Sequence, residues 1–360
     1  MAPDSCKSPT PPASASNQTG LWHICAHTIH LSVNALHVWC RGLVGVSKNR
    51  RERMQAIGNY LANKDFDFVF LQEVWKQEDF QALTKTVASV LPYSHYFYSP
   101  FNTIFAYSPM VVCVGSGVIG SGVCILSRVE IKSTLLYRYT LNGYPHKFLH
   151  GDWFGGKGVG LCRVELEGLA INLYVTHLHA EYNRANDGYL AHRISQSLEL
   201  AQFVRHTADG ADVAILGGDL NTEPGDLPHC VIQMLSGWKD AFVDIFSDLS
   251  QGMTCGHPRN TYTSRGELQL APAGKRIDYV LYRCSPDLHA KCVEFHVPMT
   301  LTTDSKVSFS DHEPLEAIIS VRPASTEKTS SSPHLVSSSI TGLYGVDSSV
   351  EVDTGTSVGQ

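Results

Sequence analysis

The sequence predicts an α+β protein in which β-sheets pack against one another and helices lie outside them. Two runs that partly alternate apolar with polar residues, 159–166 and 169–178, are joined at Glu167-Gly168 and predict a β-hairpin, so the sheet is at least partly antiparallel. Strands and helices are mixed without the strict βαβ order of a doubly wound sheet. The 360-residue chain is 43% hydrophobic, which is ample for a large core.

Two helices are predicted from apolar residues that recur on one face. The first spans about residues 47–62, with Ser47 as its N-cap, and the second about residues 188–206. Their apolar faces consist of Met54, Ile57 and Leu61 in the first helix and Ile194, Leu198 and Ala201 in the second. Besides the hairpin, buried strands are predicted over residues 67–71, 212–216, 277–282 and 315–321.

One domain over residues 31–322 accounts for these elements, because no internal repeat or linker interrupts them. Residues 1–30 and the Ser-rich residues 323–360 are predicted to be disordered, since little in them can be buried to offset the entropy of ordering. The ten cysteines form no regular framework and no signal peptide is recognisable, which favours free thiols in a reducing intracellular compartment.

Composition also limits the cellular location and the classes of partner that we expect for the protein. No apolar stretch reaches the roughly 18 residues that a transmembrane helix needs, so we expect a cytoplasmic protein or one that is peripheral on membranes. The formal net charge of −6 argues against a general nucleic-acid binder, which requires a basic face to neutralise phosphates. We therefore expect no nucleic-acid partner, and the sequence indicates no protein partner.

Five short segments carry side chains suited to metal-assisted phosphodiester hydrolysis, and several of them follow or precede predicted strands. They are Glu73, the string THLH at 176–179, the string GDLN at 218–221, Asp278, and the string SDH at 310–312. Because each fills a different role in one mechanism, we expect the ends of the strands to bring them to one site.

The pairs Asp219 with Asn221 and His177 with His179 are spaced i, i+2, which places both members on one face of an extended segment. The carboxylate and amide can position a water and a phosphate oxygen, and an imidazole can donate to a leaving alkoxide. Gly217-Gly218 would let the backbone approach a ligand closely. Each pair also has a purely structural interpretation, as a tight turn or as core histidines.

An acid–base pair is predicted at the C-terminal end. Asp278 lies within a predicted strand and would be costly to bury without a partner. His312 is a suitable partner, because a carboxylate that holds an imidazole fixes its tautomer for proton transfer. Glu73 follows a buried run and could be one of the few carboxylates that Mg²⁺ requires.

The order of these residues resembles the exonuclease–endonuclease–phosphatase superfamily, and longer strings resemble its neutral sphingomyelinases. These strings are THLHAEYN at 176–183, LNGYP at 141–145 and HGDWF at 150–154, and the similarity covers about residues 40–322. The resemblance implies a deoxyribonuclease-I-like fold, a four-layer α/β/β/α sandwich of two mixed β-sheets. It also implies Mg²⁺-dependent hydrolysis of sphingomyelin, or of a related choline phospholipid, at a membrane surface.

The resemblance further implies a role for each site residue. Glu73 would bind Mg²⁺, with Asp311 beside the metal, and His312 would be the general base, oriented by Asp278. Asp219 and Asn221 would position water and phosphate, and His177 would stabilise or protonate the leaving group. Asp152 and Lys157 would switch the site between closed and competent states, and His179 would belong to the substrate-binding residues.

Three departures from the family pattern stand out. His37 occupies the position where the family's first strand ends with an Asn, although Asn34 could serve if the register slips. Residues 99–114 resemble an apolar insertion. The paired C-terminal transmembrane helices of membrane-bound relatives are expected to be missing here, with a Ser-rich tail in their place. Two alternatives therefore stay open: a nuclease or phosphoinositide phosphatase, and a catalytically silent relative that binds a lipid or a partner.

Overall fold

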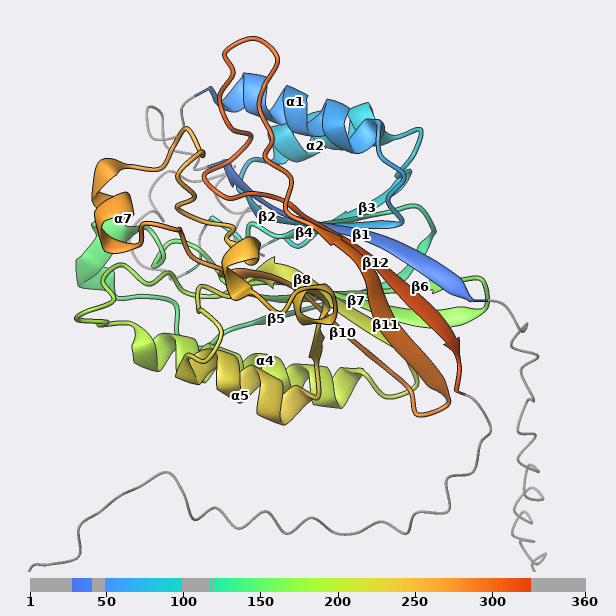
Figure 1. Ribbon diagram of the computed structural model, residues 1–360. Coiled ribbons are helices and arrows are strands. Elements are labelled where there is room, and N and C mark those ends of the chain that lie inside the picture. The colour runs from blue at the N-terminus through green and yellow to red at the C-terminus, as the bar shows by residue number, and fades with distance from the viewer. Residues whose placement is uncertain (1–27, 41–48, 99–116, 118, 325–360) are drawn as a thin grey trace, which may run out of the picture. The chain divides into compact units, whose positions relative to one another are not determined.

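The computed structural model describes residues 28–40, 49–98, 117 and 119–324. Ser47, the insertion at 99–114 and most of the two segments predicted to be disordered lie outside these described residues. Within them, the secondary structure forms two six-stranded β-sheets, and helices pack on the outer face of each sheet (Figure 1).

The first sheet has the strand order β11-β12-β1-β2-β4-β3. Its strands are β1 (Ile29–Cys40), β2 (Phe68–Val74), β3 (Tyr93–Tyr96), β4 (Cys124–Ser127), β11 (Leu288–His296) and β12 (Leu315–Pro323). The β1–β2 pair is parallel and the other pairs are antiparallel, so the sheet is mixed.

The second sheet has the strand order β5-β6-β7-β8-β10-β9. Its strands are β5 (Ile131–Arg138), β6 (Gly158–Leu166), β7 (Leu169–His177), β8 (Val213–Asp219), β9 (Lys239–Asp240) and β10 (Asp278–Cys284). The predicted hairpin is confirmed, because β6 and β7 pair antiparallel with Leu166 opposite Leu169. The β7–β8 pair is parallel, so this sheet is mixed as well.

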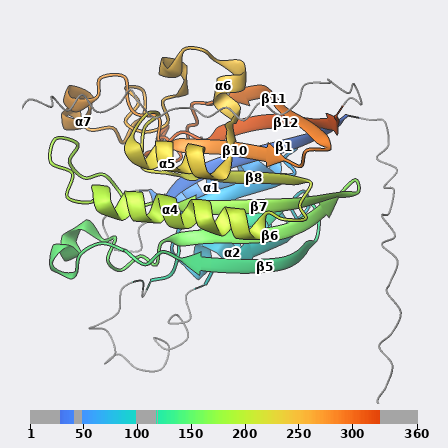
Figure 2. The same ribbon diagram turned by 90° about the horizontal axis from the view of Figure 1, so that it is seen from below.

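The helices complete a four-layer sandwich. Helices α1 (Arg50–Ala62) and α2 (Gln77–Val87) cover the first sheet, and α4 (Leu190–Thr207) and α5 (Leu227–Ser236) cover the second (Figures 1 and 2). The shorter elements are η2 (Pro145–His150), α6 (Ala241–Ile245), η3 (Leu249–Gly252) and α7 (Arg265–Leu270). This arrangement confirms the predicted α+β sandwich. No helix of the described residues is both long and apolar enough to cross a bilayer.

Three apolar clusters fill the spaces between the layers. The central one joins the inner faces of the two sheets, for example Val33 and Phe70 with Leu173 and Ile215. Burying such side chains contributes about 1.5–3 kcal/mol each, so the sheet-on-sheet contact contributes strongly to stability. The outer clusters join α1 and α2 to the first sheet, and α4 and α5 to the second.

Helix α4 differs from its predicted face. Leu198 is 40% exposed, whereas the buried face begins with the polar residues His192, Arg193 and Gln196. The reason is that the start of α4 packs on polar loops: the Gln196 side chain donates to the carbonyl of Leu141 and accepts from the backbone of His179. The apolar face predicted for the first helix is confirmed, because Met54, Ile57 and Leu61 are buried in α1.

Six of the described cysteines are free thiols, in agreement with the expectation. Cys124, Cys162 and Cys292 are buried, whereas Cys230, Cys255 and Cys284 are partly exposed. Burial raises the pKa of the Cys162 thiol to about 12, so that this group is an inert part of the core.

Strand direction brings the predicted site to one edge of the sandwich. The parallel strands β1 and β2 end at the same edge, as do β7 and β8. Strands β10 and β12 run antiparallel to their neighbours and therefore begin at that edge, with Asp278 directly opposite Asp219. Side chains at the ends of four strands and the starts of two others thus face a common centre.

Candidate active site

The structure brings the predicted catalytic side chains into one cluster at this edge. Asp219 and His177 are the last residues of β8 and β7, and Asp278 is the first residue of β10. Donor atoms that lie within 4.8 Å of one another form three groups among the described residues: His37, His177 and Asp219; His37, Asp311 and His312; and Asp219, Asp278 and His312. The residues are thus close enough to act on one substrate atom.

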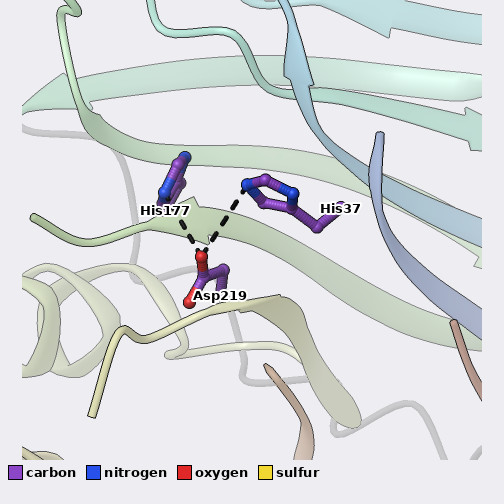
Figure 3. Close-up of side chains that lie close together, drawn as sticks. All are labelled: His37, His177 and Asp219. Atoms are coloured by element: carbon purple, nitrogen blue, oxygen red, sulfur yellow. Dashed lines mark ion pairs between the residues drawn. The ribbon is translucent and has the colours of Figure 1, made fainter. Parts of the chain in front are cut away.

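His37 lies at the centre of this cluster, between three carboxylates. Its Nε2 is 3.7 Å from Glu73 Oε1 and 3.8 Å from Asp219 Oδ2, and its Nδ1 is 3.5 Å from Asp311 Oδ1. Figure 3 shows the ring aimed at Asp219 from one side while His177 approaches the same carboxylate from the other. The position that departs from the family pattern is therefore in direct contact with the predicted catalytic groups.

The imidazoles in the site pack on one another. The His37 ring stacks on His312 with centroids 4.1 Å apart and meets His177 edge-on at 5.2 Å. Burial and the neighbouring His312 would lower the pKa of His37, but Glu73 and Asp311 outweigh them and raise it to about 9.

Asn34 does not take the place of His37. It lies three residues earlier on β1, and an odd spacing on a strand puts the two side chains on opposite faces. Its Nδ2 donates to the carbonyl of Leu315 at 2.9 Å within the sheet. The alternative register is therefore wrong.

Asp278 and His312 form the predicted acid–base pair. His312 Nδ1 lies 2.8 Å from Asp278 Oδ2, and the Thr254 hydroxyl donates to the same oxygen at 2.6 Å. Burial would lower the pKa of His312, but the carboxylate of Asp278 raises it well above its ordinary value. The imidazole is thus held by a carboxylate that is itself fixed by a second hydrogen bond.

Asp219 and Asn221 are locked to each other. The Asn221 backbone donates to Asp219 Oδ1 at 2.8 Å, and its side-chain amide donates to Asp219 Oδ2 and to the carbonyl of Leu178. Asn221 adopts a left-handed φ of 47°, which Asn tolerates better than most residues. Burial and the nearby Asp278 raise the pKa of Asp219.

Lys157 is buried in the site and binds three acceptors. Its Nζ lies 2.7 Å from Asp152 Oδ1, 2.7 Å from the carbonyl of Leu178 and 3.0 Å from His177 Nε2. Burial and the adjacent ammonium lower the pKa of His177 well below its ordinary value. His177 is therefore neutral and accepts a hydrogen bond at Nε2.

Asp152 and His179 lie beside the cluster, next to Lys157 and His177. The Tyr182 hydroxyl donates to Asp152, and although burial opposes ionisation, Lys157 lowers the pKa of Asp152 to about 2. His179 stacks on Tyr189 at 4.0 Å, and burial lowers its pKa to about 4. The Asp152–Lys157 pair is formed, so the structure records the two residues predicted as a switch in contact.

The two glycines before Asp219 serve packing. A Cβ on Gly217 would lie 2.5 Å from the Phe70 ring, and one on Gly218 would lie 2.2 Å from the carbonyl oxygen of Thr176. The prediction that these glycines admit a ligand is therefore wrong: they admit the other sheet and the neighbouring strand.

Glu73 has the backbone conformation of a strained functional residue. Its φ is 60°, in the left-handed region that non-glycine residues rarely occupy, and it is 7% exposed. The preceding Gln72 is fully buried, and neither polar atom of its side chain has a hydrogen-bond partner among the described residues. Gln72 shares a face of β2 with Phe68 and Phe70, between the sheets.

Sequence reasoning missed the residues that support the site. Thr254 holds Asp278, and Arg53, a buried residue of α1, donates to the carbonyls of Val38 and Phe309. The partners of Arg53 are 15 and 256 residues away along the chain. For Gln72 alone there was a local signal, because an amide inside the apolar run before Glu73 is unusual in a buried strand.

The site fits a divalent cation in charge and burial. Glu73, Asp219 and Asp311 surround His37 with carboxylate oxygens, and a cation stabilises such a concentration of buried negative charge. The donor set is mixed, however, because His37 and His177 add imidazole nitrogens to the oxygens that Mg²⁺ prefers.

A separate cavity of about 790 Å³ lies at the opposite ends of the same strands. It is lined by charged residues of both signs, including His30, Asp67, Arg128 and Glu316. None of the predicted site residues lines it. The chemistry is therefore concentrated at the other edge of the sandwich.

Comparison of the sequence with known proteins finds relatives that are named as phosphodiesterases and phospholipases C. A model of the Endonuclease/Exonuclease/phosphatase family matches residues 32–312. Sphingomyelin phosphodiesterase 2 of Rattus norvegicus is 40% identical over 310 residues, which are 86% of this chain and 69% of the rat protein. Inositol phosphosphingolipids phospholipase C of Schizosaccharomyces pombe is 31% identical over 306 residues, which are 79% of this chain and 67% of that protein.

Solved structures share the fold. Beta toxin from Staphylococcus aureus, in a mutant form with bound magnesium ions, superposes with a TM-score of 0.54 at 19% identity and covers 80% of this chain and 99% of the toxin. At this identity the likeness concerns the fold.

Proposed function

The chain belongs to the Endonuclease/Exonuclease/phosphatase family, and we propose that it is a phospholipase C-type hydrolase that converts sphingomyelin to ceramide and phosphocholine. The observation that carries the chemistry is the convergence of the Asp278–His312 pair with His177, Asp219 and Glu73 at one edge of the sandwich. The choice of substrate is supported by the 40% identity to sphingomyelin phosphodiesterase 2.

His312 acts as the general base. It removes a proton from the water whose oxygen attacks phosphorus, and the positive charge that forms on the ring is stabilised by Asp278. Thr254 keeps that carboxylate in place. The bond between phosphorus and the ceramide oxygen breaks, the leaving oxygen takes up a proton from solvent, and His312 returns its proton to solvent.

His177 and Asn221 stabilise the reacting phosphate. Because His177 is neutral, it acts on the leaving oxygen through a hydrogen bond, and this favours stabilisation over direct protonation. Asn221 is held rigidly by Asp219, so its amide reaches the substrate without reorganising.

Glu73 and Asp311, assisted by Asp219, would hold a divalent cation, for which Mg²⁺ is the proposed identity. When bound, the ion supplies positive charge that polarises the phosphodiester and disfavours protonation of the neighbouring His312. The bound magnesium in the structural neighbour supports this choice of ion.

Asp152 and Lys157 act as a switch beside this centre. In the observed state Lys157 contacts both Asp152 and His177. Release of Lys157 from either partner would change the hydrogen bond that His177 accepts, and with it the ability of His177 to act on substrate. His179, stacked on Tyr189, anchors the strand end that carries His177.

Other functions are less well supported. Inositol phosphosphingolipids are the second lipid candidates, because the Schizosaccharomyces pombe relative is a phospholipase C named for them. A nuclease is disfavoured by the net charge of −6. Since sphingomyelin is a bilayer lipid, we propose that the enzyme works at a membrane surface as a peripheral protein.

The first test is phosphocholine release from sphingomyelin in mixed micelles, with Mg²⁺ and with EDTA. We expect metal-dependent release that falls by about 10²–10⁴-fold in His312→Ala, the usual range for a general base. His289→Ala, at an exposed position on β11, is the matched control and should retain full activity. A folded wild-type protein that releases nothing would instead support the catalytically silent relative.

A further inference from the structure

The spacing around His37 does not suit hydrogen bonds. Its nitrogens lie 3.5–3.8 Å from the oxygens of Asp311, Glu73 and Asp219, whereas charge-assisted hydrogen bonds are about 2.7–2.9 Å long. The residue is only 4% exposed, and its Nδ1 has no hydrogen-bond partner among the described residues. A buried polar ring at such distances from three carboxylates calls for a different explanation.

These distances do suit ligands of one ion. Two donors at roughly 2.0–2.1 Å from the same ion are about 3.3 Å apart at a tetrahedral angle and further apart at wider angles. His177 Nε2 lies 3.3 Å from Asp219 Oδ2, and His37 Nε2 lies 3.8 Å from the same oxygen. Figure 3 shows both imidazoles directed at the same carboxylate oxygen of Asp219, and the three side chains belong to β1, β7 and β8.

The lone pair of His177 is available at this point, and an ion that binds His37 displaces the proton of that ring. An ammonium can only donate, so the contact of Lys157 with His177 Nε2 means that this nitrogen carries an unprotonated lone pair. Lys157 keeps two other acceptors, Asp152 Oδ1 and the carbonyl of Leu178, if an ion replaces it at His177.

We propose that His37 is a metal ligand which, with His177 and Asp219, gives the site a preference for a borderline transition ion of the Zn²⁺ class over Mg²⁺. Two imidazoles and a carboxylate form the donor set typical of catalytic Zn²⁺, whereas Mg²⁺ selects oxygen ligands. This inference rests on the proposed function in taking the same cluster as the metal site, and it differs from it in the ion that the site prefers to bind.

The test measures binding, independently of turnover. The full-length protein is stripped with a chelator and dialysed against buffered Zn²⁺ or Mg²⁺, and bound metal is determined by elemental mass spectrometry. The comparison is between wild type, His37→Asn and His37→Gln, with His95→Asn as the matched control. His95 is a half-buried histidine on β3, outside all three metal-binding groups.

Because Zn²⁺ binds most sites more tightly than Mg²⁺, the informative quantity is the ratio of the two dissociation constants. We expect both His37 variants to weaken Zn²⁺ binding at least 10-fold and to change Mg²⁺ binding by less than about threefold, while His95→Asn changes neither. Co²⁺ as a probe should give an intense tetrahedral visible spectrum in wild type that is lost in His37→Asn.

An unchanged Zn²⁺ to Mg²⁺ ratio in either variant would overturn the proposal, as would an equal loss of both ions in variants with wild-type circular dichroism. If His37→Asn does not fold, the cobalt spectrum of the wild type and the His37→Gln variant decide the matter. An enzyme that is active but lacks His37-dependent Zn²⁺ binding refutes only this inference. An inert protein that binds Zn²⁺ through His37 refutes only the proposed function.

Discussion

Replacing Asp278 with Asn tests the acid–base pair most directly. Asp278 Oδ2 accepts both the His312 imidazole at 2.8 Å and the Thr254 hydroxyl at 2.6 Å. The amide oxygen of Asn can take the place of Oδ2, so both hydrogen bonds can persist. What the variant loses is the negative charge that stabilises a protonated His312.

The size of the effect follows from that charge. A hydrogen bond to a charged group contributes about 1.5–3 kcal/mol, roughly twice the contribution of a neutral one. The charge also stabilises the imidazolium that forms as water is deprotonated, and general-base catalysis as a whole contributes about 10²–10⁴-fold. At about 1.4 kcal/mol per tenfold change, we expect kcat to fall by about 10²–10³-fold.

The assay is phosphocholine release as a function of pH. Because Asp278 raises the pKa of His312, its neutralisation lowers that pKa, and the acid limb of the kcat profile should move to lower pH while the plateau falls. Asp67→Asn is the matched control: Asp67 is equally buried and accepts from the backbone of Ser32, but at the opposite end of the strands. A plateau within threefold of wild type, or a limb that moves to higher pH, would refute the assigned roles.

Three further predictions concern the surroundings of the pair. The folded-state pKa of Asp152 is depressed from 3.8 to about 2, so its ionisation stabilises the fold above pH 4 by about 2 kcal/mol, and this is lost as the pH falls towards 2. The difference in unfolding free energy between wild type and Asp152→Asn, measured with denaturant, should therefore shrink over that window; a constant difference would contradict the linkage. Gly218→Ala should cost about 1–3 kcal/mol in the same assay, since its Cβ meets a carbonyl oxygen at 2.2 Å, whereas Gly210→Ala, with open space around it, should cost only the strain of its left-handed φ. Arg53→Met should reduce kcat with little change in KM, because it frees the loop before His312; an unchanged kcat would show that the loop is held by other contacts.

Local patterns predicted the elements that carry chemistry. The alternation in residues 159–166 and 169–178 located the β6–β7 hairpin, and the apolar runs before Glu73 and Asp219 located strands β2 and β8. These elements obey short-range rules, because a strand buried on both faces and a tight hairpin each leave a signature in consecutive residues. The place of His177 and Asp219 at strand ends follows from the same signature.

Contacts between residues that are distant in sequence could not be predicted from such local patterns. The polar face of α4 packs on loops that are distant in sequence, so the apolar residue Leu198 was assigned to the wrong side. The close approach of Phe70 and Thr176 to the two glycines depends on how the strands and sheets lie side by side. Nothing in the neighbourhood of Thr254 indicates that its hydroxyl binds a carboxylate 24 residues later.

At His37 the structure adds what the sequence pattern alone could not show. The sequence identified it as a departure from the family pattern, which left a catalytically silent relative open as an alternative to an active hydrolase. In the structure the ring is enclosed by Glu73, Asp219 and Asp311 and stacked on His312, so its charge acts on these four groups. A defective site would be expected to lose its surrounding charges, because uncompensated buried carboxylates destabilise a fold by several kcal/mol. Here the carboxylates are all present around the imidazole, and this argues that His37 is a working member of the site.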